Sequence, residues 1–222
     1  TITGLSADLT DTSTAAQTIT VADVDTITLG LGTDTTGTDD ITATAMDDGD
    51  VLTLTGANDA TLAFDDADVD ASAYTGALTV TGTGTTGQFT TGSVSSSISS
   101  TGATAIVATA MADEQTLTTS GAGAATITGL QANLTVDDAS TANIDVTLVA
   151  VDTATVALGT DTTGTKAITA TAMTNGQTLT LTGSDAATLS FANADINAST
   201  YAGALTVTGT GTTGQFTTGT VS

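Results

Sequence analysis

Aspartate is the residue type whose spacing most clearly offers chemistry in this chain. The densest cluster of carboxylates comprises Asp65, Asp66, Asp68 and Asp70. Calcium takes about six to eight oxygen ligands, and closely spaced aspartates in a turn can supply several of them. We therefore expect calcium, if the chain binds a metal, at these four residues. No other cofactor is expected.

An internal repeat, called the long repeat below, limits this expectation. Segment 26–95 matches segment 153–222 without a gap, at an offset of 153 − 26 = 127. The apolar pattern persists at that offset, whereas most carboxylates do not. The replaced residues include Asp39, Asp65, Asp66 and Asp70, which become Lys166, Ala192, Asn193 and Asn197. Most of these aspartates are therefore interpreted as solvated turn residues. Asp34 and Asp161, in the two GTDTTGT segments, are kept and are expected to hydrogen-bond within their own turns.

Catalytic chemistry is poorly supported by the residue types present. The chain has no His and no Cys, which excludes Ser/His/Asp and Cys/His nucleophilic sites. Its single basic residue, Lys166, is predicted to lie in a turn. Carboxylate pairs can hydrolyse sugars, but here they crowd into turns without an aromatic platform. We expect no enzyme activity.

The few aromatic residues recur at the offset of the long repeat. Equivalent pairs are Phe64 and Phe191, Tyr74 and Tyr201, and Phe89 and Phe216. Recurrence with the repeat predicts that these side chains pack in the widest part of the core.

Thr-x-Thr triplets suggest a different surface chemistry. They occur at 18–20, 53–55, 79–81, 116–118 and 206–208. Regular ladders of threonine on a solenoid can order water, so an ice-binding solenoid is one alternative function. Such a ladder needs one triplet per coil, whereas the spacing of these triplets varies. Alternating Thr on the polar face of each strand explains them more simply.

The charge balance excludes two classes of partner. The chain carries 24 acidic residues against one basic residue, for a formal net charge of −23. Such a surface repels nucleic-acid phosphates and anionic lipids, so we expect no nucleic-acid binding. No apolar run is long enough for membrane insertion, and no signal peptide is visible at the start. Both ends resemble the interior of a repeat, which predicts a fragment of a longer parent.

The elements that must position these residues are short strands. Alternating apolar runs recur about every ten residues, separated by Gly, Asn, Asp and Ser. A marker of Ala, then Asp or Asn, then an aliphatic residue begins at Ala7, Ala67, Ala132 and Ala194. Its spacings are 67 − 7 = 60, 132 − 67 = 65 and 194 − 132 = 62, which predict a sub-repeat of about three coils. Two long units follow: 1–125, with two sub-repeats, and 126–222, which is truncated.

Two all-β architectures fit this rhythm. One is a repeat-built parallel β-solenoid, and the other is a string of small β-sandwich domains. Aromatic residues make up only 3% of the chain, and there is no Trp. A narrow core of small side chains, together with drift in the repeat spacing, favours the solenoid.

The repeat resembles the beta-strand-repeat arrays of large secreted bacterial surface proteins of the RTX-adhesin or S-layer-like kind. The similar residues are ITATAMDDGDVLTLTGANDATLAF and the following GALTVTGTGTTGQFTTG within 41–92, with their copy in 168–219. The intact RTX nonapeptide GGxGxDxUx is not present. This resemblance implies a location outside the bacterial cell and a structural role, and it supplies no catalytic residues.

We therefore expect an extracellular structural protein at the bacterial surface, whose repeats self-associate into a layer or fibre. The ends of a solenoid expose unpaired strand edges, which favour stacking on another copy. The alternative is a passive stalk that carries the binding domain of an adhesin.

Overall fold

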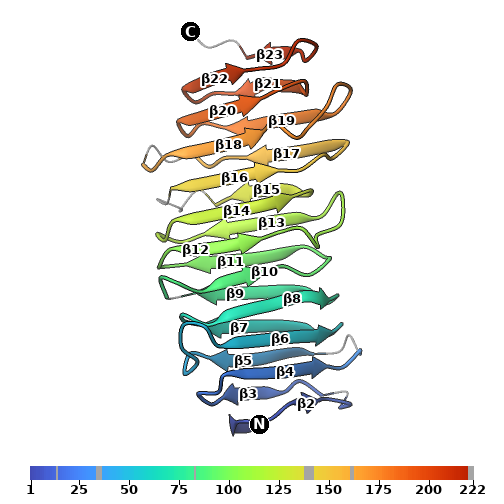
Figure 1. Ribbon diagram of the computed structural model, residues 1–222, viewed down its shortest axis with the longest axis vertical. Helices are drawn as coiled ribbons and strands as arrows, with labels where there is room; N and C mark the ends of the chain where they lie inside the picture. The colour runs from blue at the N-terminus through green and yellow to red at the C-terminus, as the bar shows by residue number, and fades with distance from the viewer. Residues whose placement is uncertain (14, 34–36, 83, 138–142, 161–162, 220–222) are drawn as a thin grey trace.

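The computed structural model is a stack of short strands that wind into a parallel β-solenoid (Figure 1). It describes residues 1–222 except 14, 34–36, 83, 138–142, 161–162 and 220–222. The described residues contain no helix, and hence none that could span a membrane. The solenoid prediction is confirmed, and the alternative of separate antiparallel sandwiches is wrong.

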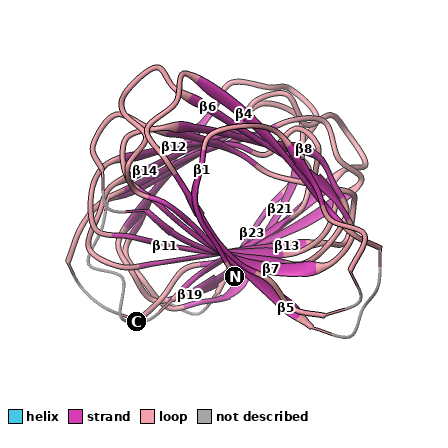
Figure 2. Cartoon of the chain, turned by 90° about the horizontal axis from the view of Figure 1, so that it is seen from below, coloured by secondary structure: helices cyan, strands magenta, loops and turns pink. Residues whose placement is uncertain are grey.

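Two parallel sheets run the length of the stack, and successive strands alternate between them. The 12-stranded sheet contains β1 (Ile2–Leu5), β3 (Thr18–Val21), β5 (Thr38–Ala43), β7 (Asp59–Phe64), β9 (Leu78–Gly82), β11 (Ser96–Ser100), β13 (Thr116–Ser120), β15 (Asn133–Val136), β17 (Thr153–Ala157), β19 (Thr178–Gly183), β21 (Asp195–Tyr201) and β23 (Phe216–Thr218). The 11-stranded sheet contains β2 (Leu9–Thr10), β4 (Thr26–Leu31), β6 (Val51–Gly56), β8 (Asp68–Tyr74), β10 (Gln88–Thr90), β12 (Thr104–Val107), β14 (Ala125–Leu130), β16 (Ile144–Leu148), β18 (Lys166–Ala170), β20 (Ala187–Phe191) and β22 (Leu205–Gly209). Each turn of the chain therefore adds one strand to each sheet (Figure 2).

Alternation of residue types explains why these segments form strands. In β9, Leu78 and Val80 point inward and are buried, whereas Thr79 and Thr81 point outward and are exposed. β-branched residues suit this pleated conformation on either face. The chain has no Pro, so no residue lacks the N–H that a parallel ladder requires.

The core consists mainly of aliphatic side chains, with a few aromatic ones, stacked from coil to coil. In the 11-stranded sheet, one continuous row is formed by residues in direct register. The row is Ile27, Leu52, Val69, Phe89, Ile106, Ile127, Val146, Ile168, Leu189 and Val207. All but Val207 are at most 2% exposed, and each buried member contributes about 1.5–3 kcal/mol of hydrophobic stabilisation.

The coils differ in length, although the rows stay in register. The offset between the paired residues Ile27 and Leu52 is 52 − 27 = 25, whereas that between Leu52 and Val69 is 69 − 52 = 17. Because the paired core residues stay aligned, the turns between strands absorb the difference. This explains why the sequence repeats drift in spacing.

The long repeat corresponds to a half-integral number of turns. The identical segment Leu-Thr-Val-Thr-Gly forms β9 in the 12-stranded sheet and β22 in the 11-stranded sheet. The difference in strand number is 22 − 9 = 13, which is six and a half turns because each turn contains two strands. Equivalent surfaces of the two copies therefore lie on opposite sheets of the rod.

The sub-repeat is less regular than expected. The markers at Asp8 and Asp68 are three turns apart, beside β2 and on β8, as are those at Asn133 and Asp195, on β15 and β21. Between Asp68 and Asn133 the chain adds seven strands, which is three and a half turns. The boundary expected between the long units, at 125 and 126, falls within β14, and both sheets continue across it.

The repeated aromatic residues pack in the core, as predicted. Phe64 stacks on Phe89 across the two sheets with ring centroids 6.4 Å apart, and Phe191 stacks on Phe216 at 6.1 Å. Tyr74 is fully buried.

Candidate functional site

The recurrence of the Asp/Asn marker has a structural cause. In all four copies, the side-chain Oδ1 of the marker residue accepts a hydrogen bond from a backbone N–H one coil further along. The pairs are Asp8 with Thr28 N at 2.8 Å, Asp68 with Gln88 N at 2.9 Å, Asn133 with Thr155 N at 2.7 Å, and Asp195 with Gln215 N at 3.0 Å. An amide oxygen serves as well as a carboxylate oxygen here. The marker therefore joins neighbouring coils, and its charge is dispensable.

Asp66 has the same role in the turn between β7 and β8. Its Oδ1 accepts hydrogen bonds from the backbone N–H groups of Thr85 at 2.7 Å and Thr86 at 3.2 Å. These bonds lower the pKa of the Asp66 carboxyl, because they favour its charged form. This contribution to stability is present above the ordinary Asp pKa and is lost as the pH falls through the lowered value. The equivalent Asn193 accepts from Thr212 N at 3.0 Å without a charge.

The four aspartates expected as calcium ligands lie along one strand and the turn before it. Asp65 and Asp66 occupy the turn, whereas Asp68 and Asp70 lie on β8. Asp70 Oδ1 accepts a hydrogen bond from Ser72 N at 2.9 Å. In the part of the chain that the structure describes, no group of three or more acidic residues is placed to hold a metal ion. Calcium binding at these residues stays a prediction of the sequence.

Substitution of Asp68 separates the two roles considered for this cluster. We expect Asp68→Asn to leave the melting temperature nearly unchanged, because the amide oxygen keeps the bond to Gln88 N as Asn133 does to Thr155 N. Asp68→Ala should lose about 1–3 kcal/mol, since it leaves that N–H without its acceptor. Thermal melts in EDTA and in millimolar calcium measure both effects. A calcium-dependent rise in the wild-type melting temperature that Asp68→Asn abolishes would instead assign Asp68 as a ligand.

Two further polar residues of the repeat are buried, contrary to expectation. Asp39 lies within β5 and is 0% exposed, so it is not a solvated turn residue. Its Oδ1 accepts from Gln17 N at 2.8 Å, and its Oδ2 accepts from the Asn58 side-chain amide at 3.4 Å. Burial of this carboxylate is possible because both oxygens are hydrogen-bonded.

Lys166, the equivalent of Asp39, does not lie in the turn where the sequence predicted it. It lies in β18 and is 1% exposed, and its Nζ is 3.5 Å from Asp185 Oδ2. Asp185 is the equivalent of Asn58. At equivalent positions, the first copy thus has an acid–amide pair, Asp39 and Asn58, and the second copy has a base–acid pair, Lys166 and Asp185. The paired change of two residues at one offset is visible in the sequence and could have indicated this contact.

The two repeated tyrosines form hydrogen bonds next to these buried pairs. The Tyr74 hydroxyl donates to the backbone oxygen of Asn58, and the Tyr201 hydroxyl donates to that of Asp185. Desolvation raises the pKa of Tyr74, and the nearby carboxylates of Asp39 and Asp59 add a smaller increase. Desolvation, with a smaller contribution from Asp185, raises the pKa of Tyr201 to about 12. The stabilisation linked to these raised values is fully present below the ordinary tyrosine pKa, and it is lost as the pH rises through the raised values.

The threonine triplets are divided between the two sheets. Triplets 18–20, 79–81 and 116–118 belong to the 12-stranded sheet, whereas 53–55 and 206–208 belong to the other. Outward residues Thr61, Thr79, Ser97 and Thr118 nevertheless stack in direct register across β7, β9, β11 and β13. The irregular spacing in sequence does not prevent a local ladder, because the turns absorb it. Ice binding stays an untested alternative.

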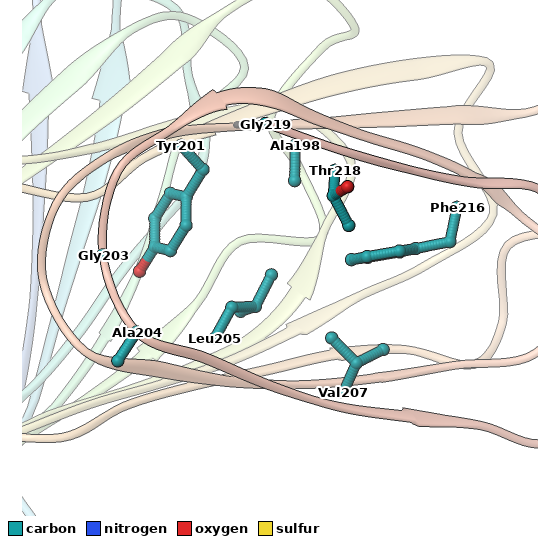
Figure 3. A pocket seen from close by; sticks show the side chains of 9 residues that line it. All are labelled: Ala198, Tyr201, Gly203, Ala204, Leu205, Val207, Phe216, Thr218 and Gly219. Atoms are coloured by element: carbon teal, nitrogen blue, oxygen red, sulfur yellow. The ribbon is translucent and has the colours of Figure 1, made fainter. Parts of the chain in front are cut away.

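A hollow of about 380 Å³ opens at the C-terminal end of the rod, lined by residues of β21, β22 and β23 and the turns beside them. It is lined mainly by apolar side chains, including those of Tyr201, Leu205, Val207 and Phe216 (Figure 3). None of its lining residues is charged.

No family model, no curated protein and no solved structure matches this chain. Its function is therefore inferred from the geometry of its own coils.

Proposed function

We propose that the chain is a structural segment of an extracellular protein of the bacterial surface, where its rods self-associate into a layer or fibre. The observation that supports this most directly is the pair of parallel sheets that continue from β1 to β23. At about 4.8 Å for each strand, the 12-stranded sheet makes a rod roughly 50 Å long. The polar groups described above join coils to one another, which is the role expected of a spacer.

A rod of residues 1–222 alone is less well covered at its first and last coils than in its middle. At one end, Ile2 and Leu5 of β1 are only half-buried, and at the other Val207 of β22 is 36% exposed. The outermost strands also carry unpaired backbone groups, which favour addition of further strands. A purified segment of residues 1–222 therefore has apolar side chains and open strand edges through which it can associate.

The half-integral repeat supports a layer in particular. Because equivalent strands such as β9 and β22 lie on opposite sheets, each long unit shows the same outer residues on the opposite face. A rod built of such units can make the same lateral contact on both sides. Two-sided contacts are what a sheet-like assembly requires. The similarity to surface-layer and adhesin repeats agrees with this proposal.

Self-association is the first test. We expect purified chain to form particles longer than one rod in negative-stain images and a concentration-dependent mass in light scattering. Val207→Asp should reduce the association, because it places a carboxylate on the apolar end. Thr206→Asp, on the adjacent outward-facing residue, distinguishes the two kinds of contact: it should spare end-to-end association and weaken only the lateral contact between rods. Monodisperse wild-type rods at all concentrations would instead favour the passive stalk of an adhesin.

A further inference from the structure

Three successive coils surround a small space beside Gly32, where the chain leaves the 11-stranded sheet for the other sheet. Asp11 follows β2, Gly32 follows β4 and Asn58 follows β6, and these three strands are neighbours in that sheet. A Cβ built on Gly32 would lie 3.5 Å from Asn58 Nδ2, 3.5 Å from Asp11 O and 3.6 Å from Ser13 O. The atoms nearest to this space are therefore all polar.

Two side-chain oxygens from the same residues are buried without a hydrogen bond from the part of the chain that the structure describes. Asn58 is 3% exposed, and its Oδ1 has no donor, although its Nδ2 bonds to Asp39. Asp11 Oδ2 is likewise buried without a donor, whereas its Oδ1 accepts from Ser13 N at 2.7 Å. Buried oxygens nearly always have a partner, so two of them beside one polar space favour a ligand that oxygen atoms attract.

The charge of this corner also favours a cation. Asp39 is 0% exposed, and the only basic residue of the chain, Lys166, belongs to the second copy. Besides desolvation, the carboxylates of Asp39 and Asp59 raise the pKa of Tyr74, whose hydroxyl bonds to the backbone of Asn58. Their negative charge therefore reaches this corner. A buried carboxylate is stabilised when a positive charge lies close to it.

The second copy shows that the equivalent corner can enclose a positive charge. Lys166 replaces Asp39, Asp185 replaces Asn58, and the Lys166 Nζ lies 3.5 Å from Asp185 Oδ2. Both side chains are at most 2% exposed. The second copy thus carries its buried cation as part of the chain. The first copy has an acid and an amide at these positions, so a cation there must come from solution.

The available donors suit calcium. They are two carboxylates, one amide and two backbone carbonyls, namely Asp11 Oδ2, Asp39 Oδ2, Asn58 Oδ1, Asp11 O and Ser13 O. Calcium takes about six to eight oxygens in flexible geometry, with water completing the set, whereas magnesium demands a near-ideal octahedron. This corner lies between β2 and β7, on chain segments that run from the 11-stranded to the 12-stranded sheet. It is therefore distinct from the cluster at 65–70, which precedes and enters β8.

We propose that the corner beside Gly32 binds one calcium ion through Asp11, Ser13 and Asn58, with Asp39 as a further carboxylate. The ion joins three successive coils and offsets the charge of the buried Asp39. It does for the first copy what the Lys166 ammonium does for the second. Binding at this site does not depend on association between rods, so it can be tested separately from the proposed function.

Gly32→Ala is the sharpest test, because its methyl group fills the space without straining the chain. Its contacts of 3.5 Å or more are ordinary packing distances, and Gly32 has no positive φ. We expect the intact wild-type chain, freed of metal with EDTA, to bind calcium in isothermal titration calorimetry and to melt at a higher temperature with calcium. Gly32→Ala and Asp11→Asn should each weaken this binding at least about tenfold. Asp48→Asn, which removes one charge from an exposed turn, is the matched control and should bind as the wild type does.

The exchange of Asp39→Lys together with Asn58→Asp gives an independent check. It supplies the first copy with the ammonium of the second, so it should remove the rise in melting temperature that calcium causes at this corner. Three outcomes would overturn the inference. They are absence of calcium binding by the wild type, unchanged binding by Gly32→Ala, and a calcium response that Asp68→Asn abolishes while Gly32→Ala does not. The last would place the ion at the cluster 65–70.

Discussion

Replacing Gly56 with alanine is expected to destabilise the solenoid more than any single change at an exposed turn. Gly56 ends β6 with φ at +112°, and it pairs directly with Leu31 of the coil before it. A Cβ on Gly56 would lie 1.5 Å from the backbone oxygen of Leu31. Neither backbone can yield without breaking the ladder that joins the two coils.

Two costs add at this position. A positive φ costs an L-residue about 1–2 kcal/mol in itself. The clash with a backbone atom must then be relieved by separating two coils. We therefore expect a loss of about 4 kcal/mol or more, the range reached only when packing or backbone geometry fails outright.

Gly49→Ala is the matched control. Gly49 has a similar φ of +92°, but a Cβ there would have no heavy atom within 4 Å. It should lose only the dihedral cost of about 1–2 kcal/mol. Urea denaturation followed by circular dichroism compares the two variants, and hydrogen exchange should place the loss in the coils next to Gly56. Equal midpoints for the two variants would contradict the close contact between coils.

The repeat provides an independent check of the same contact. Gly183, the counterpart of Gly56, has φ at +105°, and a Cβ there would lie 1.5 Å from Leu158 O. Gly183→Ala should therefore cost as much as Gly56→Ala, although the two residues lie on opposite sheets. The positive φ and the close contact with the preceding coil are therefore determined by the local sequence, and they do not depend on which sheet the strand joins.

The solenoid and its core could be predicted from the sequence, because both follow from residue types that repeat. The alternation of apolar and polar residues within β9 reflects local packing, and so does the recurrence of Phe64 and Phe89 as Phe191 and Phe216. The two-strand cross-section was not predictable in this way. Because the turns vary in length, the number of residues in a repeat does not give its number of strands. That number follows only from which residues pair between neighbouring coils.

Buried charge is where prediction from the sequence failed, and the reason is physical. Lys166 follows GTDTTGT, and charged residues next to such a segment usually lie in solvent. Its burial depends on Asp185, which lies one coil further along the chain. That partner is brought close only by stacking of the coils. Local sequence patterns cannot report a contact of this kind, although the paired change in the other copy can.

Substitutions in the buried pair Lys166 and Asp185 are expected to cause the second large loss of stability. Asp185→Asn should leave the Lys166 ammonium buried without its carboxylate, at a cost of about 3–5 kcal/mol. Lys166→Asp should cost at least as much, because it places two carboxylates together in the core. The double variant Lys166→Asp with Asp185→Asn recreates the acid–amide pair that Asp39 and Asn58 form in the first copy.

The double variant should be more stable than either single variant. Recovery should be partial, because Asp39 also accepts a bond from Gln17 N, whereas Ile144 N, at the equivalent position, already donates to Thr165 O. The converse exchange, Asp39→Lys with Asn58→Asp, should likewise be less harmful than Asn58→Asp alone. Urea denaturation of all variants gives a double-mutant cycle for each copy, with an expected coupling of about 2 kcal/mol or more. Strictly additive losses would mean that the two residues do not stabilise each other, and that each strand tolerates its buried polar group for a separate reason.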